Sequence, residues 1–381
     1  MNELPGKMKT AIIGCGMISK AYLDTLTQKF SIIDVTACCD LNEEKAKETA
    51  DTYGLTVMSM SEIMKDSAIE LVINLTTSPA HYTINKQLLK ADKHVYTEKI
   101  LSIELEEAKE LVELANERGR YLGVAPDTFL GSAIQTAKFA VDSGMIGEVT
   151  SCYGVLTRNQ LLSSAIFSSR LKKGAGIGFD VGIYYVTALL NIIGPVRTVT
   201  GFIETRNPIQ KGKFISNFGK ELVIESENLV AGSLQFKNGA VGSLLFDSNS
   251  VFSFPERPAL TIHGTLGILY MSDPNMFGGD VRILLYGEDE VRILPQCHPF
   301  REECRGLGAA EMAWSIRLGR ANRASKELGY HALEVLHGIK ISSESRQFYE
   351  MKSDFEIPKA LERGFHSAVP IPVIEESVIA F

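Results

Sequence analysis

The sequence predicts an α/β protein in which a doubly wound parallel sheet is followed by an α+β domain with a largely antiparallel, open-faced sheet. Strand-like and helix-like stretches alternate through the first 125 residues, which is typical of a parallel sheet covered by helices. After Pro126, longer segments of alternating apolar and polar residues take over, and such alternation favours antiparallel strands. We therefore expect two domains, residues 1–126 and 127–381.

The first domain is expected to contain five strands and four helices. The strands are the apolar runs 8–13, 32–39, 69–75, 93–96 and 121–125. The helical patterns between them lie at about 17–29, 42–53, 80–91 and 104–119. The segment "IELVINLTT" is almost continuously apolar, as a strand buried on both faces should be.

The second domain is expected to begin with a helix at about 130–143. Its strands are expected at 147–158, 196–206, 222–236, 239–247, 258–271 and 280–294, and its further helices at about 180–193, 305–318 and 326–340. Segment 207–221 reads as a loop. The pair Asn238-Gly239 between two strand patterns predicts a hairpin with a type I′ turn.

Composition excludes several classes of protein. The net charge of −7 and the lack of a dense basic patch argue against a nucleic-acid surface. No stretch reaches the about 18 apolar residues of a membrane helix, and the N-terminus does not resemble a signal peptide, so we expect a cytoplasmic protein. The six cysteines show no metal-binding spacing and are expected to be reduced and mostly buried, and we expect no metal.

The pair Gly14 and Gly16, between the first strand and a helix, indicates a dinucleotide site of the Rossmann type. The third glycine of that fingerprint is replaced by Ser19. Asp40 ends the second strand, where a carboxylate accepts hydrogen bonds from ribose hydroxyls and repels a 2′-phosphate. NAD is therefore expected, and NADP is disfavoured. Alternatively, Asp40 only begins a turn.

Four stretches resemble the Gfo/Idh/MocA oxidoreductases, a family named for glucose–fructose oxidoreductase and inositol dehydrogenase. They are "AIIGCGMISKAYL", "NLTTSPAHYTINKQLLKADKHVYTEKI", "APDTFLGSAIQTAKFAVDSGMIGEV" and "GAGIGFDVGIYYVTALLNIIGPV", and "RGLGAAEMAWSIRLGR" extends the likeness toward the C-terminus. The resemblance implies an NAD(P)-binding Rossmann domain, a C-terminal open-faced sheet, and oxidation or reduction of sugars and cyclic polyols.

The resemblance also implies the catalytic residues. Lys99 takes the place of the family's catalytic lysine, within Glu98-Lys99-Ile100, where the family has Glu-Lys-Pro. Asp180 and Tyr184 stand where most members have Asp-x-x-x-His, and tyrosine at this place resembles the branch of glucose–fructose oxidoreductase. The i, i+4 spacing allows both side chains to share one helix face. We expect the Lys99 ammonium to lower the pKa of Tyr184, so that the phenol can handle the proton.

Further positions are expected at the cofactor or the substrate. The cofactor-binding residues are expected to be Gly14, Gly16, Met17, Ile18, Asp40, Thr76, Thr77, Pro79, His81 and Glu98. The substrate-binding residues are expected to be Lys99, Asp127, Thr128, Arg158, Asp180 and Tyr184. Structural readings remain open: a surface turn at Glu98-Lys99, a helix cap at Asp180 or His81, a buried aromatic at Tyr184, and a solvated arginine at Arg158.

The sequence thus predicts an NAD-dependent dehydrogenase for a sugar or cyclic polyol. We expect a homodimer or homotetramer assembled through the C-terminal sheet, and neither nucleic acid nor membrane as a partner. Two alternatives remain: an NAD-binding sugar sensor without turnover, and an NAD-dependent glycoside hydrolase.

Overall fold

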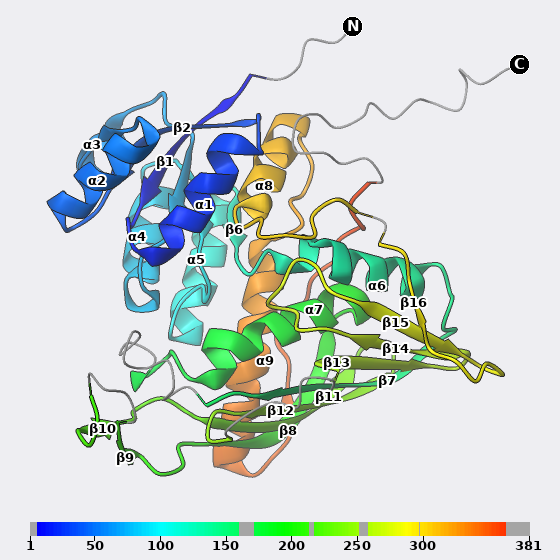
Figure 1. Ribbon diagram of the computed structural model, residues 1–381. Helices are drawn as coiled ribbons and strands as arrows, with labels where there is room; N and C mark the ends of the chain where they lie inside the picture. Colours follow the sequence, from blue (N-terminus) through cyan, green and yellow to red (C-terminus); the bar gives the residue numbers. More distant parts are fainter. Residues whose placement is uncertain (1–5, 160–170, 213–216, 251–257, 297, 363–381) are drawn as a thin grey trace, which may run out of the picture.

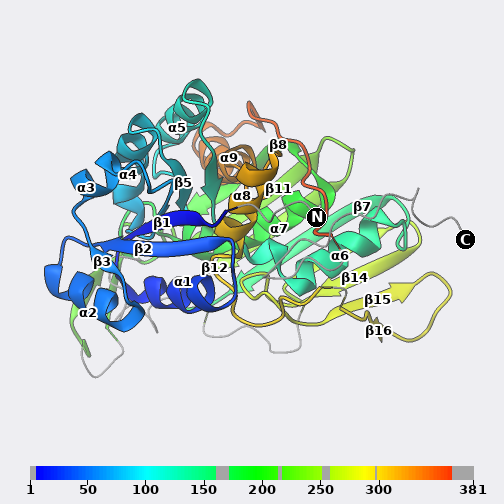
Figure 2. The same cartoon turned by 90° about the horizontal axis from the view of Figure 1, so that it is seen from above.

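The computed structural model describes residues 6–159, 171–212, 217–250, 258–296 and 298–362 (Figures 1 and 2). Its N-terminal sheet has six parallel strands in the order β3-β2-β1-β4-β5-β6. The strands are β1 (Met8–Ile13), β2 (Ile33–Cys39), β3 (Thr56–Val57), β4 (Leu71–Asn74), β5 (His94–Thr97) and β6 (Leu122–Val124). The accompanying helices are α1 (Met17–Gln28), α2 (Glu43–Tyr53), α3 (Met60–Lys65), α4 (Ser78–Lys90) and α5 (Leu105–Glu117). The predicted doubly wound sheet is confirmed.

Local signals explain where these helices begin. The Asn42 side chain caps α2 by accepting from the N–H groups of Glu44 and Lys45. Ser59 and Glu62 form a reciprocal capping box at the start of α3. The sequence did not predict β3 and α3, because β3 has two exposed residues and neither element has a long apolar pattern.

The C-terminal sheet has nine strands in the order β16-β15-β14-β13-β7-β12-β11-β8-β17. The strands are β7 (Val149–Thr157), β8 (Val196–Glu204), β11 (Leu229–Phe236), β12 (Val241–Asp247), β13 (Leu260–Gly264), β14 (Gly267–Met271), β15 (Val281–Leu285), β16 (Arg292–Ile293) and β17 (Tyr349–Glu350). Strands β7 and β12 are parallel, and the other neighbouring strands are antiparallel. The prediction of a largely antiparallel sheet is confirmed.

Three strand predictions were wrong in detail. Segment 258–271 is the hairpin of β13 and β14, and segment 280–294 contains both β15 and β16. The predicted strand 222–236 contains only β11 and the end of a separate ribbon, which consists of β9 (Ile209–Lys211) and β10 (Glu221–Val223) and lies mostly in the segment 207–221 that was expected to be a loop. Alternation of apolar residues continues across these short turns, so it does not show where the chain reverses.

The hairpin between β11 and β12 is present, but its turn is not type I′. The Gly239 N–H donates to the Phe236 carbonyl, and the Phe236 N–H donates to the Ala240 carbonyl. Gly239 has a positive φ of 96°, whereas Asn238 is not among the residues with positive φ, and a type I′ turn needs positive φ at both central residues. A three-residue loop with glycine in the left-handed position replaces it.

Helices cover one face of the large sheet (Figure 1). They are α6 (Ser132–Asp142), α7 (Ile183–Ile193) and α9 (Lys326–Ser345). All residues of α7 are buried, because it packs against α6 and α9 and, through Tyr185 and Phe246, against the sheet. On the opposite face of the sheet, Phe202, Val241 and Leu245 are among the exposed large apolar residues.

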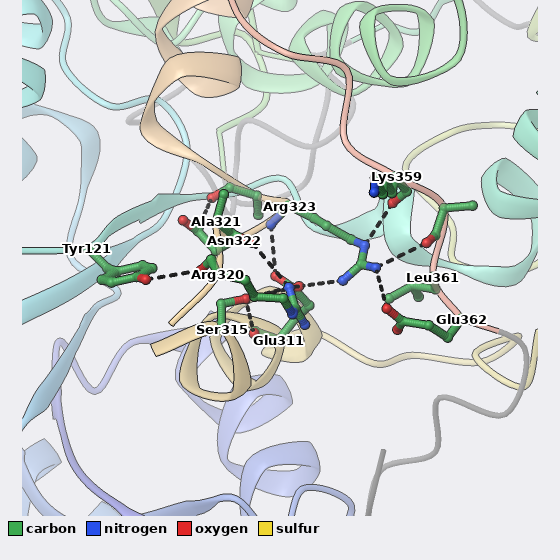
Figure 3. A network of polar contacts seen from close by, with 12 residues as sticks. Tyr121, Glu311, Ser315, Arg320, Ala321, Asn322, Arg323, Lys359, Leu361 and Glu362 are labelled. Carbon is green, nitrogen blue, oxygen red and sulfur yellow. Dashed lines mark hydrogen bonds and ion pairs between the residues drawn. The ribbon is translucent and has the colours of Figure 1, made fainter. Parts of the chain in front are cut away.

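The C-terminal helices return the chain to the first sheet. Helix α8 (Leu307–Leu318) contacts α1 and β6, and the N–H of Val124 donates to the Ala324 carbonyl. Figure 3 shows the buried polar network around Glu311, which forms ion pairs with Arg320 and Arg323. Arg323 also donates to the carbonyls of Lys359 and Ala360. One buried carboxylate thus joins α8, the start of α9 and the C-terminal segment.

The described cysteines are free thiols: Cys15, Cys38, Cys152 and Cys304 are buried, and Cys39 is partly buried. Cys297 lies outside the described residues. Within the described ranges, no group of His, Cys, Asp or Glu has the arrangement of a metal site. No helix in that part of the chain is long and apolar enough to cross a membrane.

Candidate active site and cofactor site

The loop between β1 and α1 has the geometry of a phosphate cradle. Gly14 has φ of 98°, and a Cβ atom there would lie 2.8 Å from the Leu75 carbonyl carbon. A Cβ at Gly16, by contrast, would meet nothing within 4 Å. Gly16 is the N-cap of α1, and neither a side-chain cap nor an acidic residue occupies that first turn. The exposed Met17 and the partly buried Ile18 begin a helix whose free N–H groups suit an anion.

Asp40 follows β2 beside this loop. Its carboxylate accepts hydrogen bonds from the N–H of Cys15, at 2.7 Å, and the N–H of Asn42, at 2.8 Å. These contacts hold a partly exposed carboxylate next to the glycine pair, where the ribose of a dinucleotide is expected. The loop and Asp40 together fit NAD.

The loop after β4 lies at the same carboxyl edge. Thr76 donates its N–H and its hydroxyl to Asn74 Oδ1. Thr77 is the N-cap of α4, and Pro79 follows in the first turn; both are exposed. His81 is fully buried, and its two ring nitrogens contact the carbonyls of Ile100, at 2.6 Å, and Thr76, at 2.9 Å. In this structure His81 joins two loops and does not face solvent.

Lys99 follows β5 and reaches across to the second domain. Its Nζ donates to Asp180 Oδ1 at 2.6 Å and to the Asp180 carbonyl at 2.7 Å. The same Nζ lies 5.7 Å from the centroid of the Tyr184 ring. The peptide bond between Lys99 and Ile100 is cis. Three positions expected to be catalytic therefore lie together, although they come from both domains.

Asp180 and Tyr184 sit where a π-helical turn, η4 (Gly178–Gly182), passes into α7. The Asp180 N–H donates to the Gly176 carbonyl at 2.7 Å. Tyr184 is 7% exposed. Burial raises the pKa of Tyr184 above its ordinary value, while the charges of Lys99 and Arg305 act in the opposite direction. The expectation of a lowered pKa was wrong for this state, because burial outweighs the two cations.

Burial also works to lower the pKa of Lys99, but the nearby Asp180, Tyr184 and Glu98 outweigh it, so the pKa is raised. Lys99 is therefore a cation at neutral pH. Glu98 is buried: its Oε1 accepts from the Tyr22 hydroxyl at 2.7 Å, and its Oε2 accepts from the Lys99 N–H at 3.0 Å. Glu98 thus connects α1 to the backbone of Lys99.

The remaining expected substrate positions lie apart from this centre or serve other contacts. Asp127 is 2% exposed, and its Oδ2 accepts from the N–H groups of Gly306 and Gly308. Burial raises the pKa of Asp127 to about 6, although these two N–H groups lower it. Thr128 is buried beside it, and Arg158 is exposed just after β7.

Sequence reasoning missed Arg305. Its charge acts to lower the pKa of Tyr184 against the effect of burial, and its guanidinium contacts Glu303 and Asn275. Arg305 opens the stretch "RGLGAAEMAWSIRLGR", so the likeness to the family already included it, but nothing in the local pattern separated it from a surface arginine.

The six-stranded parallel sheet and the glycine loop after β1 define a protein with a Rossmann domain. Residues 8–125 match the family described as "Oxidoreductase family, NAD-binding Rossmann fold", and residues 134–270 match the "GFO/IDH/MocA C-terminal domain". These two matches cover more than half of the chain, which belongs to the Gfo/Idh/MocA family.

Similar proteins include an uncharacterised oxidoreductase of Schizosaccharomyces pombe, 27% identical over 53% of this chain and 56% of that protein. An inositol 2-dehydrogenase/D-chiro-inositol 3-dehydrogenase of Lactiplantibacillus plantarum is 30% identical over 37% of this chain and 41% of that protein. The alignments thus span about half the length of these relatives. The structure of levoglucosan dehydrogenase with NADH and L-sorbose has the same fold, with a TM-score of 0.79 and 20% identity over 91% of this chain and 99% of the other.

Proposed function

We propose that this protein is an NAD-dependent dehydrogenase that acts on a hydroxyl group of a sugar or cyclic polyol. The observation that supports it most directly is the contact of Lys99 with Asp180 and with the Tyr184 ring. This places an ammonium group and a phenol together at the carboxyl edge of a Rossmann sheet, where ligands of this fold bind. Relatives named inositol dehydrogenases agree with a polyol substrate.

The cofactor would be held by the glycine loop and the edge of the sheet. The first turn of α1 suits the pyrophosphate, Asp40 the ribose, and the Thr76–Pro79 loop the nicotinamide half. When bound, the nicotinamide supplies the acceptor for the hydride of the substrate C–H bond. We propose that Glu98 lies near the nicotinamide ribose.

The protein's own residues would handle the proton. Tyr184 accepts the proton of the substrate hydroxyl during oxidation and returns it during reduction. The Lys99 ammonium stabilises negative charge on the substrate oxygen and on the phenol oxygen. Asp180 positions Lys99 through its carboxylate and its carbonyl. Thr128 and Arg158 remain candidates for contacts with other substrate hydroxyls.

A screen of sugars and polyols with NAD, followed by the absorbance of NADH, tests the proposal. We expect NADH to accumulate with at least one cyclic polyol or aldose. Binding of NAD and a sugar without turnover would favour the sensor, and release of nitrophenol from nitrophenyl glycosides without net NADH would favour the hydrolase. Either result would contradict the dehydrogenase.

We also propose a homodimer or homotetramer that buries the open face of the large sheet. Phe202, Val241 and Leu245 are 52%, 52% and 38% exposed, respectively. They lie on β8 and β12, the two strands on either side of β11, and such apolar surface commonly packs against another subunit. Sedimentation should show an assembly that Val241→Lys weakens. A monomer at micromolar concentration would contradict this part of the proposal.

A further inference from the structure

A pocket of about 280 Å³ lies where the starts of α4 and α5 meet a segment of the second domain. Ser78 and Pro79, at the start of α4, form one wall. Residues 102–104 and Glu107, at the start of α5, form the next wall, and Lys173 of the second domain forms the third. The volume is close to the about 300 Å³ at which small-molecule sites begin, so the pocket has the size of a binding site for one small group.

The first two walls are continuous with the candidate active site. The ring of His81 contacts the carbonyls of Thr76, at 2.9 Å, and Ile100, at 2.6 Å, and so joins the two loops that lead into these walls. Ser102 follows Lys99 by three residues, which span at most about 11 Å. The described residues that line the pocket do not include Lys99. The pocket therefore lies beside the reacting groups, and a ligand that occupies both places has to extend past Lys99.

Contacts between the domains fix the third wall. The Lys173 Nζ donates to Glu104 Oε1 at 2.6 Å. A Cβ at Gly174 would lie 2.7 Å from Ile103 Cγ1, so the two segments pack closely. Gly174 stands six residues before Asp180. The pocket thus forms where the first domain meets the segment that leads to Asp180.

The lining has the chemistry of a site for a neutral sugar ring. Pro79 and Ile103 supply apolar surface for the C–H groups of a ring, beside a few polar groups, as in small-molecule sites generally. The Glu107 Oε2 accepts from the Ser102 hydroxyl, which uses one of the about four acceptor positions of a carboxylate. The remaining positions can accept from sugar hydroxyls. Two carboxylates and one ammonium line the pocket, so an anionic group such as a phosphate or a uronate is disfavoured.

We propose that this pocket binds the second ring of a neutral disaccharide or other glycoside, whose oxidised ring lies at Lys99 and Tyr184. This inference rests on the dehydrogenase function proposed above and narrows its substrate class. The second ring packs on Pro79 and Ile103 and donates hydroxyl hydrogens to Glu107. A single-ring sugar occupies only one of the two places, so it should be the poorer substrate.

Two substitutions at the start of α5 test the pocket. Glu104→Trp places a large side chain in it, and Glu107→Gln removes a charged acceptor while keeping the shape of the side chain. Glu106 is exposed, lies in the same turn of the helix and does not belong to the described lining. Glu106→Trp and Glu106→Gln are therefore the matched controls.

The substrates are compared as pairs of one-ring and two-ring compounds: D-glucose with maltose and cellobiose, and myo-inositol with galactinol. The absorbance of NADH gives kcat/KM for each. In the wild type, kcat/KM should be roughly 10- to 100-fold higher for at least one two-ring compound than for its one-ring partner. This ratio should fall by about tenfold or more in Glu107→Gln and approach one in Glu104→Trp, and both Glu106 variants should keep the wild-type ratio.

Calorimetric titration of the same compounds into the complex with NADH measures binding without oxidation. If the wild type oxidises no sugar or polyol, the dehydrogenase function fails, and tighter binding of a two-ring compound that Glu104→Trp removes still supports the pocket. If Glu104→Trp does not fold, Glu107→Gln is compared with Glu106→Gln by the same titration.

Three results would overturn the assignment of the pocket. The first is that no two-ring compound binds or reacts better than its one-ring partner. The second is that the Glu106 controls change the ratio as much as the variants of Glu104 and Glu107 do. The third is that Glu104→Trp weakens the binding of NADH and leaves the ratio unchanged, which would assign the pocket to the cofactor.

Discussion

Tyr184 and Lys99 are the residues whose chemistry can be tested most directly. Tyr184→Phe keeps the buried ring and its contact with Lys99 but removes the hydroxyl. If Tyr184 transfers the proton, turnover should fall by about 10²- to 10⁴-fold, while NAD affinity measured by titration stays near that of the wild type.

Lys99→Met provides the matched comparison, and it should reduce turnover at least as much. Because the two groups would act as a unit, the double variant should be little worse than either single variant. Near-normal turnover of Tyr184→Phe on the true substrate would instead show that Tyr184 does not transfer the proton and only packs beside the substrate.

Asp40 should decide between the two cofactors. Its carboxylate is fixed by two backbone N–H groups, and the neighbouring Leu41 is fully exposed. Changing Asp40→Ser together with Leu41→Arg removes the negative charge and adds a cation for a 2′-phosphate. The ratio of the Kd values for NADP and NAD should fall by roughly 10- to 100-fold, measured by titration. Glu44→Gln, an exposed change nearby, should leave the ratio unaltered, and equal wild-type affinity for both cofactors would contradict the assignment of Asp40.

At this scale the sequence predicted part of the site. The i, i+4 spacing allowed Asp180 and Tyr184 to share a helix face, and Lys99 contacts both side chains; only the likeness to a family linked either residue to Lys99. The sequence could not show that Asp127 is buried against Gly306 and Gly308, because that contact joins distant parts of the chain. The same holds for Arg305, whose guanidinium contacts Asn275 on a distant part of the chain.

The loop between β1 and α1 separates a structural glycine from a functional one. The backbone of Gly14 has a positive φ, which strains any residue with a side chain. A methyl group at this position would also contact the backbone of Leu75 and Thr76. Gly14→Ala should therefore destabilise the fold by about 1–3 kcal/mol. Gly16→Ala adds a methyl group in open space, so the free energy of unfolding should change by less than about 1 kcal/mol.

The same methyl group at Gly16 would stand where a phosphate approaches the helix, so NAD affinity should fall by roughly tenfold or more. Urea unfolding and NAD titration on both variants check the two effects. Unchanged NAD affinity in a folded Gly16→Ala protein would place the pyrophosphate elsewhere.

Glu227 gives the start of the η4–α7 segment a pH dependence. The Oε1 atom of its carboxylate is buried and lies 2.0 Å from where a Cβ of Gly176 would be. Burial raises the pKa of Glu227 from 4.5 to about 7, despite the charge of Lys340. The folded protein therefore binds a proton that the unfolded chain releases, and the stabilising effect is lost as pH rises from about 4.5 to about 7.

Relative to Glu227→Gln, the wild type should accordingly lose up to about 3 kcal/mol of stability across that pH range. Urea unfolding of both proteins at several pH values measures the difference, and groups such as Asp127 cancel because both proteins contain them. If the difference in free energy of unfolding between the wild type and Glu227→Gln stayed constant over this pH range, the pKa of Glu227 would not be raised by folding.

Elements with a long apolar pattern were predicted well, and short ones were not. The strands β1, β2, β4 and β6 lie within the predicted runs, and β5 extends one residue beyond its run, to Thr97, because buried parallel strands are almost continuously apolar. The ribbon of β9 and β10 consists of partly or fully exposed residues, so no hydrophobic signal separated it from a loop. Gly182, the last residue of the π-helical turn at Gly178–Gly182, packs against Phe246, which lies on a distant strand.

For the whole molecule, the network around Glu311 should be a main source of stability (Figure 3). Glu311 is fully buried and is paired with Arg320 and Arg323. Glu311→Gln leaves both arginines without this counter-charge and should lower the free energy of unfolding by about 3–5 kcal/mol. Glu362, which is 57% exposed and pairs with the same Arg323, is the control, and Glu362→Gln should change it by less than about 1 kcal/mol. Equal effects of the two changes would show that burial does not set the strength of this network.

The order of the two sheets along the chain was predicted from the change in residue pattern after Pro126, where segments of alternating apolar and polar residues begin. The contact of α8 and α9 with the first sheet was not predicted. The apolar residues of these helices show that the helices are buried, but they do not show which element covers them. The contact between Val124 and Ala324 joins segments that are far apart in the sequence.

The contact of α8 and α9 with the first sheet has a consequence for how the protein is made. On the ribosome, all six strands of the Rossmann sheet emerge long before residues 307–329, whose helices contact β6 and α1. Strand β6 is one edge of that sheet, and it pairs at Gly123 with Ser325 only after the chain has been made as far as residue 325. Until then the nascent chain presents an uncovered apolar edge, which is a surface for trigger factors and other chaperones that hold unfinished chains. A truncated chain that ends before α8 should for the same reason aggregate or remain bound to such chaperones.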